Sequence, residues 1–156
     1  TALSAYKSFE KSINEGGVIF KDSEGSEWIE EYIVLPPTHI LNGFIWALFG
    51  VYDLWKFTGN QNAENLFFRC LKTLNDNLYK YDVGYWSKYE LTEHKIKMIA
   101  SPFYHDLHII QLLILYRMTK NNLFYEIANK WSGYKNYRWN RFKAIIEKSI
   151  FKLLYY

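Results

Sequence analysis

The segment from about His39 to Phe57 constrains the fold most, because apolar side chains would cover nearly the whole circumference of a helix there. Its large apolar residues are Ile40, Leu41, Phe44, Ile45, Leu48, Phe49, Tyr52 and Trp55. A helix that is apolar on most sides must be buried by other elements. The chain is therefore predicted to build a core around this helix.

Helix-breaking residues bound this segment on both sides. Pro36-Pro37 forces an extended break before it, Thr38 is a candidate N-cap, and Thr58-Gly59-Asn60 closes it. Gly43 and Gly50 cost helix stability. We therefore expect another backbone to pack closely against these two glycines.

Apolar residues recur at helical spacing in five further segments. These are Leu3 to Ile13 before Gly16-Gly17, and about 61–79, 104–120, 122–134 and 138–154. Two β-hairpins are expected between them: Val18–Asp22 with Glu27–Tyr32 around a glycine-containing turn, and Tyr85–Leu91 with Lys95–Ile99.

A short internal sequence similarity suggests that helix pairs repeat. Asn65-Leu66-Phe67-Phe68 resembles Asn122-Leu123-Phe124-Tyr125, 122 − 65 = 57 residues later. Repeated helix hairpins build solenoids or closed α/α toroids. We predict an all-α fold, a single (α/α) toroid-type domain over residues 1–156 with two short hairpins.

Composition narrows the class of protein. With 49% hydrophobic and 20% aromatic residues the chain is not disordered, and a net charge of +3 does not suggest nucleic acid as a partner. Its single cysteine, Cys70, excludes an internal disulfide and a cysteine-based metal site, and is expected in the core. Neither a signal peptide nor a membrane span is recognisable, and the chain opens inside an amphipathic segment, as a piece of a longer protein would.

The stretch from Ser101 to Gln111 is the candidate site. Pro102 breaks the preceding segment, and Tyr104, His105, Asp106 and His108 then fall in the first turns of an apolar helix. Free N–H groups and the positive end of the helix dipole favour an anionic ligand there. The alternative is that Tyr104 and both histidines are packing residues, which residue types alone favour.

Other chemistries have less support. His105 and His108 are three residues apart, but no HExxH or Cys/His pattern accompanies them, so no metal is expected. Ser101 lies in no nucleophile elbow, so a Ser/His/Asp triad is not expected.

The run Glu30-Glu31-Tyr32 is a candidate for carboxylate chemistry. Either Glu31 or its two neighbours would face the covered side of a strand, where burial raises the pKa of a carboxyl group. The alternative is a solvated acidic strand edge.

Several motifs together resemble the D-glucuronyl C5-epimerases, specifically their C-terminal helical domain. They are Glu30-Glu31-Tyr32; Leu41-Asn42-Gly43-Phe44 with Gly50-Val51-Tyr52-Asp53-Leu54; Tyr81-Asp82-Val83-Gly84; Trp86 to Leu91; Tyr104 to Leu112; and Lys130-Trp131-Ser132-Gly133-Tyr134. They occur in family order from about Ala5 to Tyr134.

The resemblance implies an isomerase that inverts C5 of glucuronic acid in a heparosan-like polysaccharide without a nicotinamide cofactor. It implies Glu31, Tyr32, Tyr89 and Tyr104 as catalytic residues. Substrate-binding candidates are Lys88, His94, His105, His108 and Asn42. The partners it implies are the anionic polysaccharide, β-rich N-terminal domains that this chain lacks, and a second copy in a homodimer. Animal members are Golgi-lumenal, whereas a microbial homologue could be cytoplasmic.

The chain departs from the family pattern near Tyr89. Thr92 stands where the family has an arginine, and Glu90 stands where it has an aspartate. Lys88, His94, Lys95 or His105 are candidates to replace the lost charge. Removing the C5 proton builds enolate-like charge that needs cationic or hydrogen-bonding partners, and a tyrosine base, with a free pKa of about 10, needs help toward its phenolate.

In a toroid, hairpin strands and helix starts that follow a break lie at the same rim, so we predict one cleft shared by Glu31, Tyr32, Tyr89 and Tyr104. Tyr104 and either Glu31 or Tyr32 would flank C5 from opposite faces, with Tyr89 in the same cleft. Two alternatives remain: a uronate lyase, which shares the first step, and a non-catalytic carbohydrate-binding module.

The last helix, about 138–154, is strongly basic and has Trp139, Phe142, Ile146, Ile150 and Leu153 on one face. It either packs through this face with its basic face in solvent, or it binds an anionic polysaccharide, a membrane surface or a partner.

Overall fold

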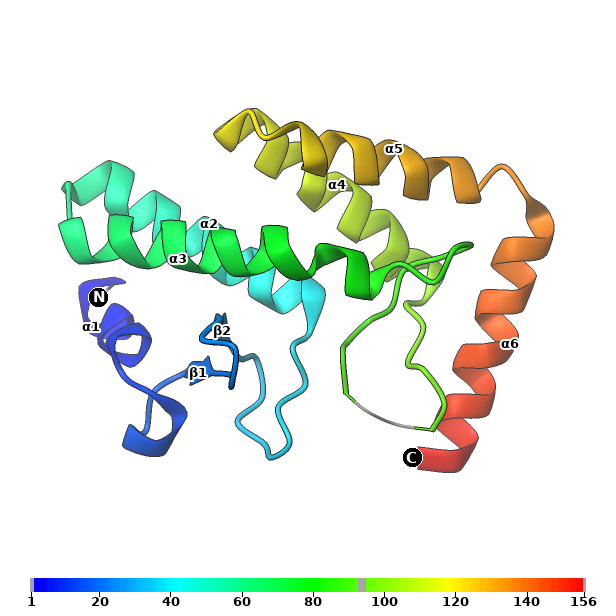
Figure 1. Ribbon diagram of the computed structural model, residues 1–156, viewed down its shortest axis with the longest axis horizontal. Helices are drawn as coiled ribbons and strands as arrows, with labels where there is room; N and C mark the ends of the chain where they lie inside the picture. Colours follow the sequence, from blue (N-terminus) through cyan, green and yellow to red (C-terminus); the bar gives the residue numbers. More distant parts are fainter. Residues whose placement is uncertain (1, 93–94, 156) are drawn as a thin grey trace. The chain divides into compact units, whose positions relative to one another are not determined.

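The computed structural model describes residues 2–92 and 95–155 and forms two compact units, Thr1–Leu78 and Tyr79–Tyr156 (Figure 1). Its described part holds six α-helices and one two-stranded antiparallel sheet. The predicted helical class is thus confirmed. Closure into a toroid stays a prediction.

The first unit is built on a pair of long helices. It contains α1 (Ala2–Tyr6), η1 (Lys7–Glu10), η2 (Ile13–Glu15), β1 (Ile19–Lys21), β2 (Glu27–Ile29), α2 (Leu41–Thr58) and α3 (Gln61–Asn77). Helices α2 and α3 lie side by side (Figure 1), joined through Gly59, whose φ of 68° ends α2. Asn60 then starts α3 by accepting the Ala63 N–H at 2.9 Å. Both long helices were predicted.

Three local expectations in this unit are wrong. The first helix is broken into short α and 3-10 turns. Thr38 does not cap α2, because His39 takes a left-handed φ of 48° and the helix starts only after Ile40. Gly43 faces the carboxylate of Glu31 rather than a backbone, and Gly50 has no described atom close to the position of a Cβ.

The predicted stripe on α3 forms the core of the unit. Ala63, Leu66, Phe67, Cys70 and Leu74 are all buried. Burial raises the pKa of the Cys70 thiol to about 12, so the predicted core thiol is confirmed and is unreactive at neutral pH.

The described part of the second unit holds three α-helices, α4 (Pro102–Thr119), α5 (Asn122–Tyr134) and α6 (Arg138–Tyr155), and the 3-10 helix η3 (Leu78–Tyr81) leads into it. The second predicted hairpin is reduced to isolated antiparallel bridges, Asp82 with Ser87 and Lys88 with Ile99. Hydrogen bonds from the Tyr89 N–H to Met98 O and from the Ala100 N–H to Ser87 O extend the second bridge. These bonds fix the backbone around Tyr89 without a regular ladder.

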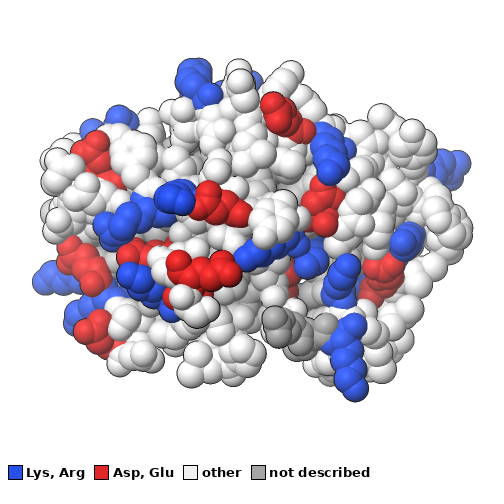
Figure 2. Space-filling model, viewed as in Figure 1, with Lys and Arg blue, Asp and Glu red and all other residues white. Residues whose placement is uncertain are grey.

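Positive and negative side chains are mixed on one face of the molecule. On the face drawn in Figure 2, Lys and Arg side chains are interspersed with Asp and Glu. None of the described helices is long and apolar enough to cross a membrane.

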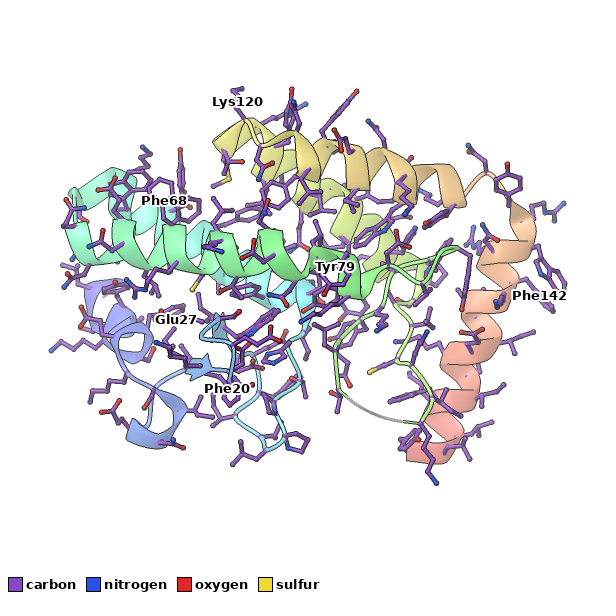
Figure 3. All side chains as sticks on the ribbon, viewed as in Figure 1. Phe20, Glu27, Phe68, Tyr79, Lys120 and Phe142 are labelled. Atoms are coloured by element: carbon purple, nitrogen blue, oxygen red, sulfur yellow. The ribbon has the colours of Figure 1, made fainter. Side chains whose placement is uncertain are left out.

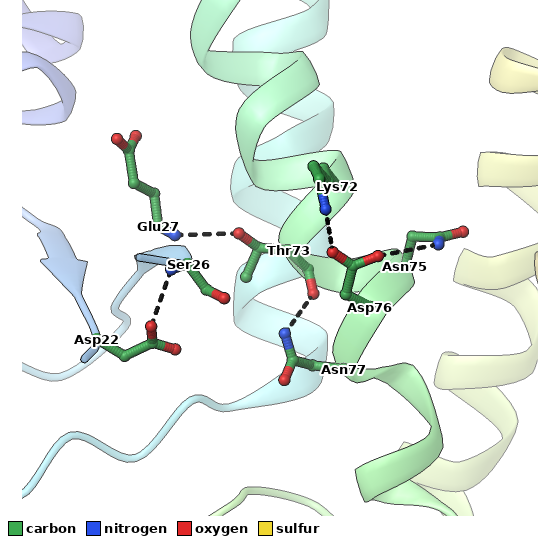
Figure 4. A network of polar contacts seen from close by, with 8 residues as sticks. All are labelled: Asp22, Ser26, Glu27, Lys72, Thr73, Asn75, Asp76 and Asn77. Atoms are coloured by element: carbon green, nitrogen blue, oxygen red, sulfur yellow. Dashed lines mark hydrogen bonds and ion pairs between the residues drawn. The ribbon is translucent and has the colours of Figure 1, made fainter. Parts of the chain in front are cut away.

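A polar network fastens the β1–β2 hairpin to α3 (Figure 4). The two strands pair with Phe20 opposite Trp28, and the Glu27 N–H donates to Thr73 Oγ1 on α3 at 3.0 Å. The Asn77 amide donates to the carbonyl of the buried Thr73 at 2.8 Å. Glu27 itself also reaches α3, through Arg69 at 2.8 Å.

We expect Thr73→Val to lower the free energy of unfolding by about 1–3 kcal/mol, because it leaves the Glu27 N–H without its acceptor. Urea denaturation measures the loss, and amide hydrogen exchange at Glu27 should accelerate. Ser149→Ala is the control, since the exposed Ser149 hydroxyl only donates within its own helix. An unchanged Glu27 exchange rate in Thr73→Val would contradict the assignment.

Candidate active site

The first turn of α4 is capped from within. Ser101 is its N-cap, and Ser101 Oγ accepts the Tyr104 N–H at 3.3 Å, while the Ser101 carbonyl accepts the His105 N–H at 2.8 Å. Pro102 follows as the first helical residue and has no N–H. The helix begins as predicted, but its first turn has fewer amides to offer an anion than the sequence suggested.

Tyr104 and Tyr89 lie against each other. Their ring centroids are 4.9 Å apart and their planes meet at 67°, an edge-to-face contact. Both rings pack, half-buried, on the core cluster of Trp86, Ile99, Ala100 and Ala144. Two residues 15 positions apart therefore present adjacent phenols.

His105 is held as a neutral ring with a defined tautomer. Its Nδ1 accepts the Ser87 N–H at 3.2 Å, and since an amide can only donate, the ring proton must be on Nε2. Nε2 then donates to the Trp131 carbonyl at 3.1 Å. The ring is also stacked on Trp86 at 3.8 Å between centroids.

His108 completes the network. Ser87 Oγ lies 2.8 Å from Nδ1 of His105 and 3.0 Å from Nδ1 of His108, so it links the two rings. Nε2 of His108 is buried and has no hydrogen-bond partner among the described residues. Because an orphan N–H is the costlier state, Nδ1 of His108 carries its proton.

Burial keeps both imidazoles uncharged. It lowers the pKa of His105 to about 4 and that of His108 to about 3, and each ring is fully buried. At neutral pH neither ring offers a positive charge to an anionic substrate. The geometry gives them a positioning role beneath Tyr104, and direct substrate contact by His105 and His108 stays a prediction.

A cation from α6 lies beside Tyr89. Lys148 Nζ is 5.1 Å from the centroid of the Tyr89 ring and donates to the Ile99 carbonyl at 3.2 Å. Burial lowers the pKa of Lys148, and the buried carboxylate of Glu90 acts in the opposite direction. The residue pattern alone did not place Lys148 beside Tyr89. Its one signal was its place in the basic last helix, 59 residues after Tyr89 (148 − 89).

Lys88 lies in the same segment as Tyr89 and is half-buried. Desolvation, followed by the charge of Lys97, lowers its pKa. Thr92 is half-buried, and His94 lies outside the described residues.

The first unit holds Glu31 against the start of α2. The carboxylate of Glu31 lies over Gly43, so closely that a Cβ at this position would overlap with it. Burial of the carboxyl group raises the pKa of Glu31, although part of the residue is exposed. The missing Cβ of Gly43 thus gives Glu31 its place at the first turn of the helix, where the dipole favours a carboxylate.

The neighbouring Glu30 turns the other way. It is buried, accepts the His39 N–H at 3.1 Å and pairs with Nδ1 of the same residue. The His39 ring stacks on the buried Trp28 at 4.2 Å. The alternation of side chains along a strand allowed Glu30 to face inward and Glu31 outward. It did not predict that Glu30 pairs with His39, which follows the double proline.

The predicted site residues divide between the units. Glu31, the exposed Tyr32 and the buried Asn42 belong to the first unit, and Lys88, Tyr89, Tyr104, His105 and His108 belong to the second. The structure brings Tyr89 and Tyr104 together. The cleft shared with Glu31 and Tyr32 stays a prediction. The described part of the chain holds no cluster of three His, Cys, Asp or Glu side chains that could bind a metal ion.

Comparison with known proteins gives a family match over most of the chain. Residues 1–133 match the family described as the D-glucuronyl C5-epimerase C-terminus. An uncharacterized protein of Methanocaldococcus jannaschii is 32% identical over 131 residues, 81% of this chain and 41% of that protein. A D-glucuronyl C5-epimerase of Caenorhabditis elegans is 28% identical over 149 residues, 86% of this chain and 24% of that enzyme. The chain therefore spans less than half the length of these relatives.

The buried histidines predict a pH dependence. Because their pKa values of about 4 and 3 lie below the unfolded value near 6.5, the unfolded chain binds more protons between these limits. Their contribution to stability is full above about pH 6.5 and is lost as pH falls toward 3. In the native protein, the Cε1 protons of His105 and His108 should keep their neutral NMR shifts down to about pH 5. A ring that titrates near 6.5 would contradict this burial.

Proposed function

The chain belongs to the D-glucuronyl C5-epimerase C-terminal family, and from this membership we propose that it takes part in epimerisation at C5 of D-glucuronic acid residues in a heparosan-like polysaccharide. The observation that carries the proposal is the contact between the phenols of Tyr89 and Tyr104, inside the matched region. As in its longer relatives, this part would act together with the rest of a complete enzyme, within a toroidal helical domain.

The proposed reaction needs two groups on opposite faces of the sugar ring. One group breaks the C5–H bond by taking the proton, and the electron pair moves into the carboxylate as an enediolate. The other group gives a proton to C5 from the opposite face, and the carboxylate reforms. No oxidant or reductant is consumed, so side chains suffice.

The Tyr89–Tyr104 pair is assigned to one face. Adjacent phenols can pass a proton between them, and a cation close to a tyrosine favours its phenolate. Lys148 supplies that cation at Tyr89. It thereby takes the place of the charge that Thr92 does not provide.

Glu31, with Tyr32 beside it, is assigned to the other face. The raised pKa of Glu31 suits a carboxyl group that exchanges protons near neutral pH better than an ordinary glutamate does. Gly43 acts by positioning this carboxylate. Lys88, Asn42 and His94 are proposed to contact the substrate.

The test follows deuterium from heavy water into a glucuronate polymer. Uptake at C5 without chain cleavage supports epimerisation, and an unsaturated product that absorbs ultraviolet light means a lyase. Polymer binding with neither reaction means a carbohydrate-binding module. The assay should include the complete protein to which the chain belongs.

We expect Tyr104→Phe in that protein to abolish exchange at C5, a loss of at least about 100-fold, because it removes one proton-carrying hydroxyl. The fold should stay intact by circular dichroism. Tyr79→Phe is the matched control, since Tyr79 is exposed and marked in Figure 3. Full activity in Tyr104→Phe would refute the assigned role.

Lys148→Met should raise the pH at which exchange sets in, because the phenol of Tyr89 loses the neighbouring charge that favours its ionised form. Lys148→Arg should restore the profile. Arg117→Met, which removes an exposed cation near the end of α4, should leave it unchanged. A shifted profile separates this role from a structural one. An unshifted profile in Lys148→Met would show that the charge does not act on the reaction.

A further inference from the structure

Helix α6 packs through a different face from the one that its sequence suggests. Its buried residues are Ala144 and Phe151, seven positions apart, and Phe151 stacks on Tyr155 at 4.7 Å. The predicted apolar face is instead in solvent. We call it the outer face of α6: Trp139, Phe142, Ile146, Ile150 and Leu153.

The exposure of the outer face is large and continuous. Each of its five residues is between 41% and 85% exposed, and they follow one another at steps of three or four residues from Trp139 to Leu153. Figure 3 shows Phe142 projecting outward from α6. A continuous apolar stripe on the surface of a soluble domain marks an interaction site.

Cations border the outer face on both sides. At 100° per residue, Arg138 borders one edge of the stripe and Lys143 borders the other, whereas Lys152 and Arg141 lie farther round the helix on the Arg138 side. Glu147, the one acidic residue of α6, is engaged with the Tyr85 hydroxyl and lies 3.8 Å from Lys143. The border of the stripe therefore keeps a positive charge.

An open hollow in the first half of α6 adds to this pattern. It has a volume of about 570 Å³, and it is lined by Lys135, Arg138, Trp139, Arg141, Phe142 and Ile145. Three cations and two aromatic rings line it, and because Lys135 pairs with Asp106 at 2.5 Å, Arg138 and Arg141 are the two cations left for an anion. The cations of this hollow can bind an anionic headgroup, and its aromatic rings can contact the apolar layer beneath that headgroup.

We propose that the outer face of α6 binds the surface of an anionic lipid bilayer. The apolar stripe enters the boundary between headgroups and acyl chains, and the bordering Lys and Arg side chains reach the lipid phosphates. Trp139 suits the same boundary, because its ring is apolar and its N–H is polar. This role is independent of the proposed epimerisation, since the outer face lies on the opposite side of α6 from Lys148.

Two other occupants fit less well. Two copies meeting through this stripe would bring bordering cations close to one another, and stable dimers use about 20–30 residues a side. A polysaccharide would pair with the cations, but Ile146, Ile150 and Leu153 offer its hydroxyls nothing. An anionic bilayer offers acyl chains to the apolar stripe and phosphates to the bordering cations.

The experiment mixes the complete protein to which the chain belongs with vesicles and measures co-sedimentation. We expect binding to vesicles of phosphatidylcholine with about 30% phosphatidylglycerol, little binding to pure phosphatidylcholine, and loss of binding as salt is raised. Phe142→Ser/Ile146→Ser should remove the binding. Arg138→Gln/Arg141→Gln should weaken it by about fivefold for each cation lost.

Matched controls lie elsewhere on the surface. Phe57→Ser replaces a phenylalanine that is 93% exposed at the end of α2, and Arg117→Gln replaces an exposed arginine of α4. Both should bind vesicles like the unchanged chain. The proposal is overturned if the chain ignores anionic vesicles or if the outer-face variants bind undiminished. It is also overturned if Phe142→Ser/Ile146→Ser dissolves a dimer, or if a soluble polyuronate binds the arginines while vesicles do not.

Discussion

In the second unit, the imidazole of His105 joins α4 to α5 and to the segment that leads to Tyr89. This ring stacks on Trp86, accepts a hydrogen bond from the Ser87 backbone and donates one to the Trp131 carbonyl, so one side chain of α4 fixes α5 and the segment that leads to Tyr89. A charged ring could not make both bonds, because an imidazolium has no acceptor. Burial, which keeps the ring neutral, is therefore the condition for the bonds that bring Tyr89 next to Tyr104.

The sequence predicted those features that depend on neighbouring residues. The spacing of apolar side chains and the breaks at Gly59 and Pro102 sufficed to predict helices α2 to α6. The turn around Gly25 sufficed to predict the β1–β2 hairpin. The start of α2 failed because His39 adopts a left-handed conformation while Glu30 binds it, and no local propensity records such a long-range pairing. The second hairpin failed because its pairing stops after a few bonds.

Candidate site residues could be named from the sequence, but their charge and burial could not. Residue types and family resemblance pointed to Tyr89, Tyr104 and Glu31, whereas the charge of each histidine depends on burial, which only the fold determines. His105 and His108 were expected to contact an anion because they follow a helix start, and the fold adds that both rings are buried, uncharged and linked through Ser87. Lys148 escaped notice because a cation 59 residues away along the chain (148 − 89) becomes a neighbour of Tyr89 only when α6 packs.

Helix α6 shows how one element can serve two surfaces. An amphipathic pattern says that one face is apolar, but it does not say that this face is the one buried within the chain. In α6 the small Ala144 permits close packing and Phe151 fills the space beside it, so a narrow inner face is enough to hold the helix. The inner side also delivers Lys148 to Tyr89. The wider apolar stripe is then left for a ligand outside the chain, and its border of cations determines the sign of charge which that ligand must carry.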